Sequence, residues 1–85
     1  MTWTVAVAKP AQKQAAKFPD KDQDRIRAAV LAMREDPFFG DVIKLEGGGN
    51  RWRRRVGSYR IFFSVGQTSR TVEVSAIVRR TSTTY

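Results

Sequence analysis

The spacing of the apolar residues changes twice along the chain. In residues 3–7 the larger apolar side chains occupy every second position, which predicts a short strand with one buried face. From Pro10 onward the apolar spacing becomes helical, and this first helix should end at Phe18 because Pro19 follows it. The chain should therefore begin with a strand and a helix.

A second helix is predicted directly after Pro19. Asp20 and Gln23 have the spacing of a capping box, in which each side chain satisfies a free backbone N–H at the helix start. One apolar stripe follows at helical spacing: Ile26, Ala29, Val30 and Met33. We expect this helix to run to about Arg34, because Pro37 blocks its continuation.

Residues 36–50 connect the helices to the rest of the chain. They contain a short extended segment at residues 42–45 and three consecutive glycines at residues 47–49. A phosphate-binding P-loop would need a following Gly-Lys-Ser/Thr and a helix, whereas Asn50 and Arg51 lead into a strand. We therefore interpret the glycines as a connecting loop.

Three strands are predicted at residues 51–56, 59–65 and 71–79. Gly57 and Ser58 separate the first two, and glycine at the first position of a two-residue loop favours a type II′ turn. The order is strand, helix, helix and then three strands joined by short loops. This order predicts the α+β class, with an antiparallel sheet and both helices packed on one of its faces.

Pairing around Gly57 and Ser58 sorts the hairpin side chains onto two faces. One face is apolar and should meet the helices: Trp52, Val56, Tyr59, Ile61 and Phe63. The opposite face is basic: Arg51, Arg53, Arg55, Arg60 and Phe62. Arg54 falls on the apolar face and should extend past an edge. In the last strand Val72, Val74, Ala76 and Val78 share one phase, so we expect Arg79 to project with the arginines.

Residues 51–60 carry five arginines and no acid. Guanidinium groups stay charged and form forked hydrogen bonds to phosphate. Arg55 and Arg60 should lie directly opposite each other, which costs about 0.2–1 kcal/mol relative to a neutral pair. The pattern predicts a polyanionic partner that relieves this repulsion. The alternative is an ordinary solvated face of an antiparallel sheet.

The net charge of +8 is concentrated in the second half of the chain. Residues 1–43 carry seven bases and six acids, whereas residues 44–85 carry nine bases and two acids. A localised excess of this kind indicates a nucleic-acid partner, although a generally basic soluble protein is the simpler alternative.

Length and composition exclude several classes of protein. Eighty-five residues, 41% of them hydrophobic, are typical of one globular domain spanning residues 1–85. The chain has no cysteine and no histidine, so we expect no disulfide, no zinc site and no cofactor. No apolar stretch approaches the ~20 residues of a membrane span, and we expect a cytoplasmic protein that does not contact membranes.

The chain resembles the RelE/ParE superfamily of toxins from toxin–antitoxin pairs, over essentially its whole length. The order and spacing of five features carry the resemblance: the opening strand at residues 3–7, the helical pair, Asp36-Pro37 before residues 43–47, the segment 53–61 and the ending 79–85.

This resemblance implies a metal-independent endoribonuclease that cuts messenger RNA in the ribosomal decoding site by attack of the RNA 2′-hydroxyl. By position it implies five catalytic residues: Arg53, Arg55, Arg60, Arg79 and Tyr85. It implies further RNA contacts from Arg51, Arg54, Phe62, Arg80 and Lys44.

The arginines would bind phosphate and stabilise the transition state, Phe62 would stack on a base, and Tyr85 would act as general base. Tyr85 is the last residue, and the alternative is a side chain without a catalytic role. The chain also has arginine where the best-known RelE toxins have hairpin lysines, and arginine hardly exchanges protons.

The resemblance also implies a cognate antitoxin as partner, in a toxin–antitoxin hetero-oligomer, besides the ribosome and messenger RNA. ParE-type relatives share the fold and poison DNA gyrase, so a gyrase inhibitor without nuclease activity is the alternative. A plain nucleic-acid-binding module is the third interpretation.

Overall fold

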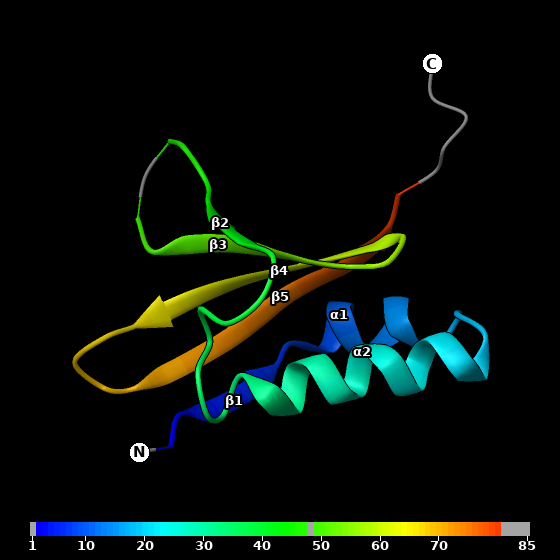
Figure 1. The fold of residues 1–85 in the computed structure, drawn as a ribbon, viewed down its shortest axis with the longest axis horizontal. Helices are drawn as coiled ribbons and strands as arrows, with labels where there is room; N and C mark the ends of the chain where they lie inside the picture. The colour runs from blue at the N-terminus through cyan, green and yellow to red at the C-terminus, as the bar shows by residue number, and fades with distance from the viewer. Residues whose placement is uncertain (1, 48, 81–85) are drawn as a thin grey trace.

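One sheet carries the fold, and both helices cover the same face of it (Figure 1). The computed structural model describes residues 2–47 and 49–80. Within these residues the elements are β1 (Thr4–Val7), α1 (Lys9–Ala15), α2 (Asp20–Ala32), β2 (Val42–Lys44), β3 (Arg51–Val56), β4 (Tyr59–Gly66) and β5 (Thr71–Arg79). The predicted α+β class and the order of elements are confirmed, and the extended segment at residues 42–45 contains the short strand β2.

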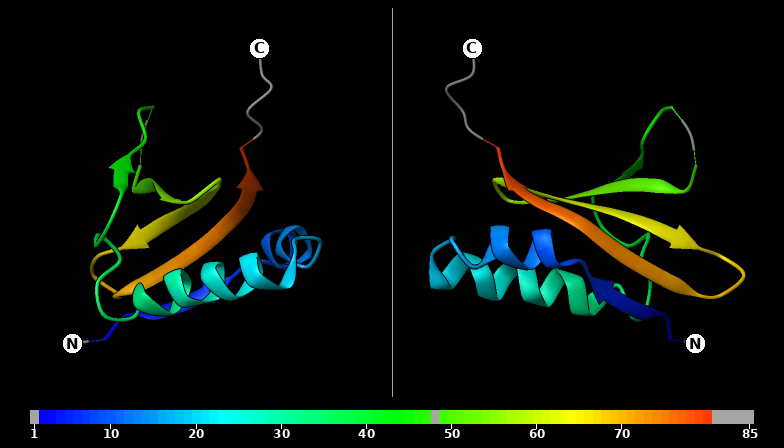
Figure 2. Two further views of the ribbon diagram at one scale, coloured as in Figure 1. Left: turned by 45° about the vertical axis from the view of Figure 1, so that its right-hand side comes forward. Right: turned by 180° about the vertical axis from the view of Figure 1, so that it is seen from behind.

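The strands follow the spatial order β1-β5-β4-β3-β2. Strands β2 to β5 pair antiparallel, whereas β1 runs parallel to β5, with Val5 opposite Val72 and Val7 opposite Val74. Figure 2 shows the twist of the sheet and the position of both helices on one side. The opposite face is left without a covering helix in the described part of the chain.

Helix α1 is shorter than predicted. The helix ends at Ala15, with a last α-helical hydrogen bond from the Ala16 N–H to Gln12, and two tighter turns, in which Lys17 and Phe18 donate to Gln14 and Ala15, lead to Pro19. The Gln14 side chain fixes the helix to the sheet, because its Oε1 accepts a 2.7 Å hydrogen bond from the Ile77 backbone N–H.

Helix α2 begins where predicted but is not capped as predicted. Asp20 makes no side-chain capping bond, and the Gln23 amide instead donates to the Phe18 carbonyl at 2.7 Å. The capping-box prediction is therefore wrong, because Gln23 closes the preceding turn instead. Ile26, Ala29 and Met33 of the predicted stripe are buried against the sheet.

The hydrophobic core lies between the sheet and the helices. Its buried residues in the described chain are Trp3, Ala11, Ile26, Ala29, Met33, Tyr59, Ile61, Phe63, Val65, Val72, Val74 and Ile77. Phe38 extends the core towards β3 through an edge-on contact with Trp52, at 4.8 Å between ring centroids. None of the described helices is both long and apolar enough to cross a bilayer.

The hairpin of β3 and β4 has the predicted register. Val56 pairs with Tyr59 and Arg55 with Arg60 around the turn. Gly57 has a φ of +57°, whereas Arg70 is the one described non-glycine residue with a positive φ, so Ser58 is not left-handed. This combination is that of a type II′ turn.

A β-bulge interrupts the pairing of β4 with β5. Phe62 pairs with Ala76 and Phe63 pairs with Val74, so Ser75 is the extra residue, and its hydroxyl donates to the Phe62 carbonyl at 3.3 Å. The alternation of β5 shifts by one position at the bulge. The prediction that one phase runs through the whole strand is therefore wrong.

Candidate nucleic-acid interface

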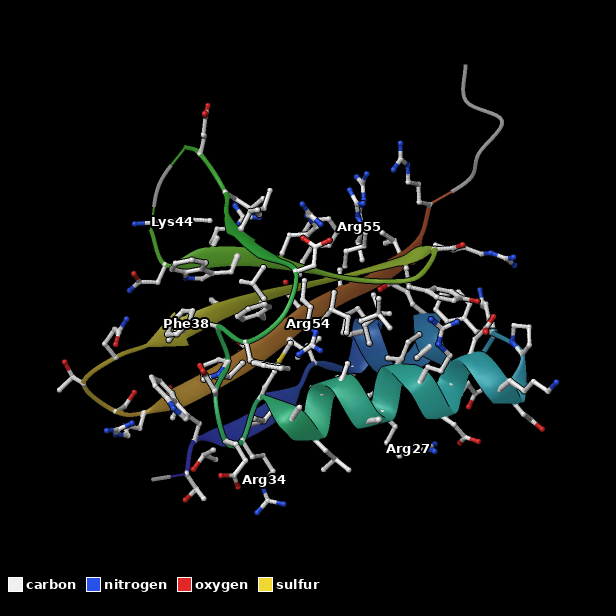
Figure 3. The ribbon with its side chains drawn as sticks, in the orientation of Figure 1. Arg27, Arg34, Phe38, Lys44, Arg54 and Arg55 are labelled. Atoms are coloured by element: carbon white, nitrogen blue, oxygen red, sulfur yellow. The ribbon has the colours of Figure 1, made fainter. Side chains whose placement is uncertain are left out.

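The basic face of the hairpin lies on the side of the sheet that the helices leave open. We call it the arginine face and define it as Arg51, Arg53 and Arg55 of β3 with Arg60 and Phe62 of β4. Figure 3 shows Arg55 pointing away from the helices, whereas the neighbouring Arg54 points towards them. The strand alternation thus separates adjacent arginines as the sequence predicted.

Two arginines of this face hold buried nitrogens without a partner. Arg53 is 9% exposed, and its Nη1 is buried with no hydrogen bond. The Nε of Arg60 is buried and unbonded as well. Within residues 2–47 and 49–80, neither side chain forms an ion pair with an acid. A buried charged donor without a partner destabilises a fold by roughly 1–3 kcal/mol or more, so an anion that bonded these nitrogens would stabilise the protein.

Arg55 does have an acidic neighbour, Asp41, which the sequence analysis missed. The connector from α2 to β2 carries Asp41 to the rim of the arginine face, where its Oδ2 lies 3.6 Å from Arg55 Nε. The Asp41 carbonyl also accepts a 2.9 Å hydrogen bond from the Arg55 N–H. The two residues are 14 positions apart, and only the pairing of β2 with β3 brings them together.

Arg79 does not join the arginine face. The bulge at Ser75 turns it to the helix side, where it pairs with Tyr59 and its guanidinium carbon lies 5.7 Å from the centroid of that ring. The prediction that Arg79 projects with the other arginines is therefore wrong. Ile77, buried two positions earlier, is the sequence signal of this change, because it is a large apolar residue out of phase with Val72 and Val74.

Tyr59 is also on the helix side. It is 3% exposed, its ring packs 4.5 Å from Phe18, and its hydroxyl donates to Asp22 Oδ2 at 2.5 Å. The Asp22 carboxylate, followed by desolvation, raises the pKa of Tyr59, and Arg79 and Arg25 oppose this shift. The side chain is thus a structural link between β4 and α2.

Replacing Tyr59 by phenylalanine should lower the midpoint of thermal unfolding, because Asp22 loses its donor.

The raised pKa of Tyr59 also predicts the direction in which stability changes with pH. The stabilisation by the phenol is complete below its unfolded pKa of about 10 and is lost as the pH rises through the higher folded pKa. Thermal melts from pH 7 to 11 should show a loss of stability above pH 10 that is smaller in Tyr59→Phe. Equal alkaline losses in both proteins would contradict this assignment.

The predicted RNA contacts divide between the two sides. Arg51 and Phe62 lie on the arginine face, and a hollow of about 260 Å³ beside Phe62 is lined by Leu45, Arg51 and Ser75 among others. Lys44 pairs with Trp52 on the helix side, and its Nζ lies 5.9 Å from that ring centroid.

Arg54 and Arg80 take different positions. Arg54 lies under the connector, where a Cβ on Gly40 would be 3.2 Å from its guanidinium, and two of its nitrogens are buried without a partner. Arg80 is exposed beside the hairpin turn, held by a 2.6 Å hydrogen bond from its N–H to Ser58. Tyr85 lies outside the described residues.

No protein-family profile and no curated protein sequence matches the chain. Solved structures do match it. The RelE–RelB complex of Pyrococcus horikoshii is 28% identical, with a TM-score of 0.85 over 96% of this chain and 99% of that one. The isolated RelE toxin of E. coli is 16% identical, with a TM-score of 0.80 over 95% and 87%. A YoeB/ParE toxin from Agrobacterium tumefaciens is 15% identical, with a TM-score of 0.74 over 92% and 99%.

The fold is therefore that of the RelE-like toxins, and the resemblance found in the sequence is confirmed.

Proposed function

We propose that the chain is the toxin of a type II toxin–antitoxin system and that it cleaves messenger RNA on the ribosome. The observation that carries the proposal is the pair of buried, unpaired guanidinium nitrogens on the open face of the sheet, in Arg53 and Arg60. An RNA phosphate supplies the charge and the acceptors that these groups lack. The structural likeness to RelE toxins and RelBE complexes supports the same class of function.

The proposed reaction needs no cofactor. The RNA 2′-hydroxyl attacks the adjacent phosphorus, and charge accumulates on the phosphoryl oxygens in the transition state. Arg53, Arg55 and Arg60 surround the site where that charge develops. Arg79 then acts from the helix side and not within the phosphate site, and the general-base role of Tyr85 stays a prediction.

The partners follow from the same proposal. A cognate antitoxin would neutralise the arginine face in a hetero-oligomer, and cytoplasmic ribosomes would supply the messenger RNA. Several structural relatives are complexes of this composition, which supports the pairing.

Toeprinting of translating ribosomes tests the proposal. The wild-type protein should produce new breaks in ribosome-bound messenger RNA, and Arg60→Ala should reduce their rate by about 10²-fold or more, because it removes a preorganised donor. Arg27→Ala is the matched control, since Arg27 is exposed on α2 and pairs only with Asp24 within the described residues. Absence of cleavage by the wild type, or undiminished cleavage by Arg60→Ala, would refute the nuclease function.

A gyrase inhibitor is the second candidate. The likeness to a YoeB/ParE toxin and the absence of Arg79 from the arginine face favour it. In this case DNA supercoiling by gyrase should be inhibited equally by the wild type and by Tyr85→Phe. The two assays together separate the candidates.

A further inference from the structure

We propose that Asp41 is the general base of the RNA cleavage and accepts the proton of the attacking 2′-hydroxyl. This inference rests on the proposed nuclease function and deepens it. It assigns the proton transfer to a described residue on the rim of the arginine face. Arg55 would serve as the link between this base and the phosphate.

The position of Asp41 is the first argument. Of the acids in the described chain, Asp41 is the one paired with an arginine of this face, at 3.6 Å from Arg55 Nε. Its carboxylate is about half exposed, so a ligand can reach it. Glu73 also lies on the open side of the sheet, but it pairs with Ser64 near the far end of β4.

The second argument is the reach of Arg55. Its Nε faces Asp41, and within the described residues no ion pair with an acid occupies its two Nη atoms. A phosphate bound by these Nη atoms would lie beside the Asp41 carboxylate. Because the attacking 2′-oxygen is adjacent to the phosphorus, a phosphate bound in this way would bring the 2′-hydroxyl close to the Asp41 carboxylate.

The third argument is chemical. The chain has no histidine, and the arginines of the site do not exchange protons near neutral pH. A carboxylate is the remaining proton acceptor on this face of the described chain. Asp41 would therefore complete a site that otherwise only binds and stabilises charge.

The backbone holds Asp41 in place from both sides. The Arg55 N–H donates to the Asp41 carbonyl at 2.9 Å, and the Val42 N–H donates to the Gly40 carbonyl at 2.9 Å. Gly40 has a φ of +93°, and its Cα packs over the Arg54 guanidinium, where a side chain would be only 3.2 Å away. The half-buried Arg54 thus has a positioning role, because it supports the turn that presents Asp41.

The step balances without a metal or an added reactant. Asp41 Oδ2 takes the proton as the 2′-oxygen forms its bond to phosphorus. The bond from phosphorus to the 5′-oxygen breaks, and the leaving oxygen takes a proton from solvent. The products are a 2′,3′-cyclic phosphate and a 5′-hydroxyl, and Asp41 returns its proton to water.

Single-turnover cleavage on programmed ribosomes, with the toxin in saturating excess, tests the assignment. Asp41→Asn should lower the rate by about 10²–10³-fold, the size of a general-base contribution. Asp41→Glu keeps the carboxylate and should stay within about tenfold of the wild type by the same reasoning. Glu73→Gln is the matched control, because it removes an exposed acid from the same face away from Arg55, and it should leave the rate unchanged.

The pH dependence separates proton transfer from a merely structural effect. The pH–rate profile of Asp41→Asn should lose the acidic limb that the wild-type profile shows. The charged groups that face Asp41 are Arg55 of β3 and, beyond it, Arg60 of β4, with Arg54 below the connector. All three are arginines and stay charged over this range.

Two results would overturn the inference. One is cleavage by Asp41→Asn within threefold of the wild-type rate. The other is weaker binding of a non-cleavable 2′-O-methyl RNA by Asp41→Asn with an unchanged rate at saturation, which would make Asp41 a binding residue. Both leave the nuclease function intact, whereas a wild type that never cleaves would refute the function itself.

Discussion

Substitution of Arg53 by methionine should reduce messenger-RNA cleavage by about 10²–10³-fold, the usual cost of removing one preorganised transition-state donor. The same substitution should not destabilise the protein. Methionine has a similar length and fills irregular apolar space, while the buried, unbonded Nη1 disappears. We expect the free energy of unfolding to rise by about 1 kcal/mol, because an unsatisfied buried donor is removed.

The reason for this opposite effect is the environment of Arg53. It pairs with Phe62 on β4 and with Ile43 on β2, so apolar neighbours surround its stem. A group that destabilises the free protein but binds a ligand is typical of a functional site. An ordinary solvated arginine would give neither the stability gain nor the loss of activity.

Two measurements check this prediction: single-turnover cleavage on ribosomes and chemical denaturation of the free protein. Arg27→Met is the control, because Arg27 is exposed on α2, away from the arginine face, and pairs with Asp24. Its effects on both quantities should be small. A lower stability of Arg53→Met, together with wild-type cleavage, would show that Arg53 is a packing residue.

The hairpin could be predicted from the sequence because three local signals agree. Gly57 fixes the turn, the period-two pattern fixes the faces, and a one-residue slip would bury the arginines and expose Tyr59, Ile61 and Phe63. The register of β3 with β4 therefore matches the prediction at each pair. Arg53, Arg55 and Arg60 were assigned to the correct face for the same reason.

The position of Arg79 could not be predicted by the same argument. A bulge adds one residue to a strand, and although Ile77 is out of phase with Val72 and Val74, the pattern of residues 71–79 does not determine that Ser75 is the extra residue. The buried Ile77 explains it afterwards, since burial of that side chain outweighs the regular alternation of the strand. A period-two prediction holds only up to the first bulge.

Asp41 was missed because its relation to the site is non-local. Residues 36–50 predict only a short extended segment, and the sequence does not indicate which strand this segment pairs with. The pairing of Ile43 with Arg53 determines that Asp41 reaches Arg55. Residues 51–60 contain no acid, but in the folded chain Asp41 lies beside Arg55. The expectation of an arginine cluster without nearby acids is therefore wrong.

The cognate antitoxin should raise the melting temperature of the chain by about 15 °C or more when it is present at a thousandfold excess over its dissociation constant. Ligation at that excess contributes about 4 kcal/mol. For a domain of this size each 1 kcal/mol corresponds to about 4–8 °C. The net charge of +8 and the unpaired nitrogens of Arg53 and Arg60 are the features that an acidic partner would neutralise.

Differential scanning fluorimetry of the chain with the protein encoded beside it checks the size of this shift, and a double variant locates it. Arg53→Met with Arg60→Met removes the two unpaired guanidiniums, so the antitoxin should raise the melting temperature of this variant by less than that of the wild type. Arg27→Met with Arg34→Met removes the same charge from exposed positions of α2 and the residues after it, and should keep the full shift. An equal shift in all three proteins would mean that the antitoxin leaves the arginine face open, and the absence of any shift would contradict the pairing itself.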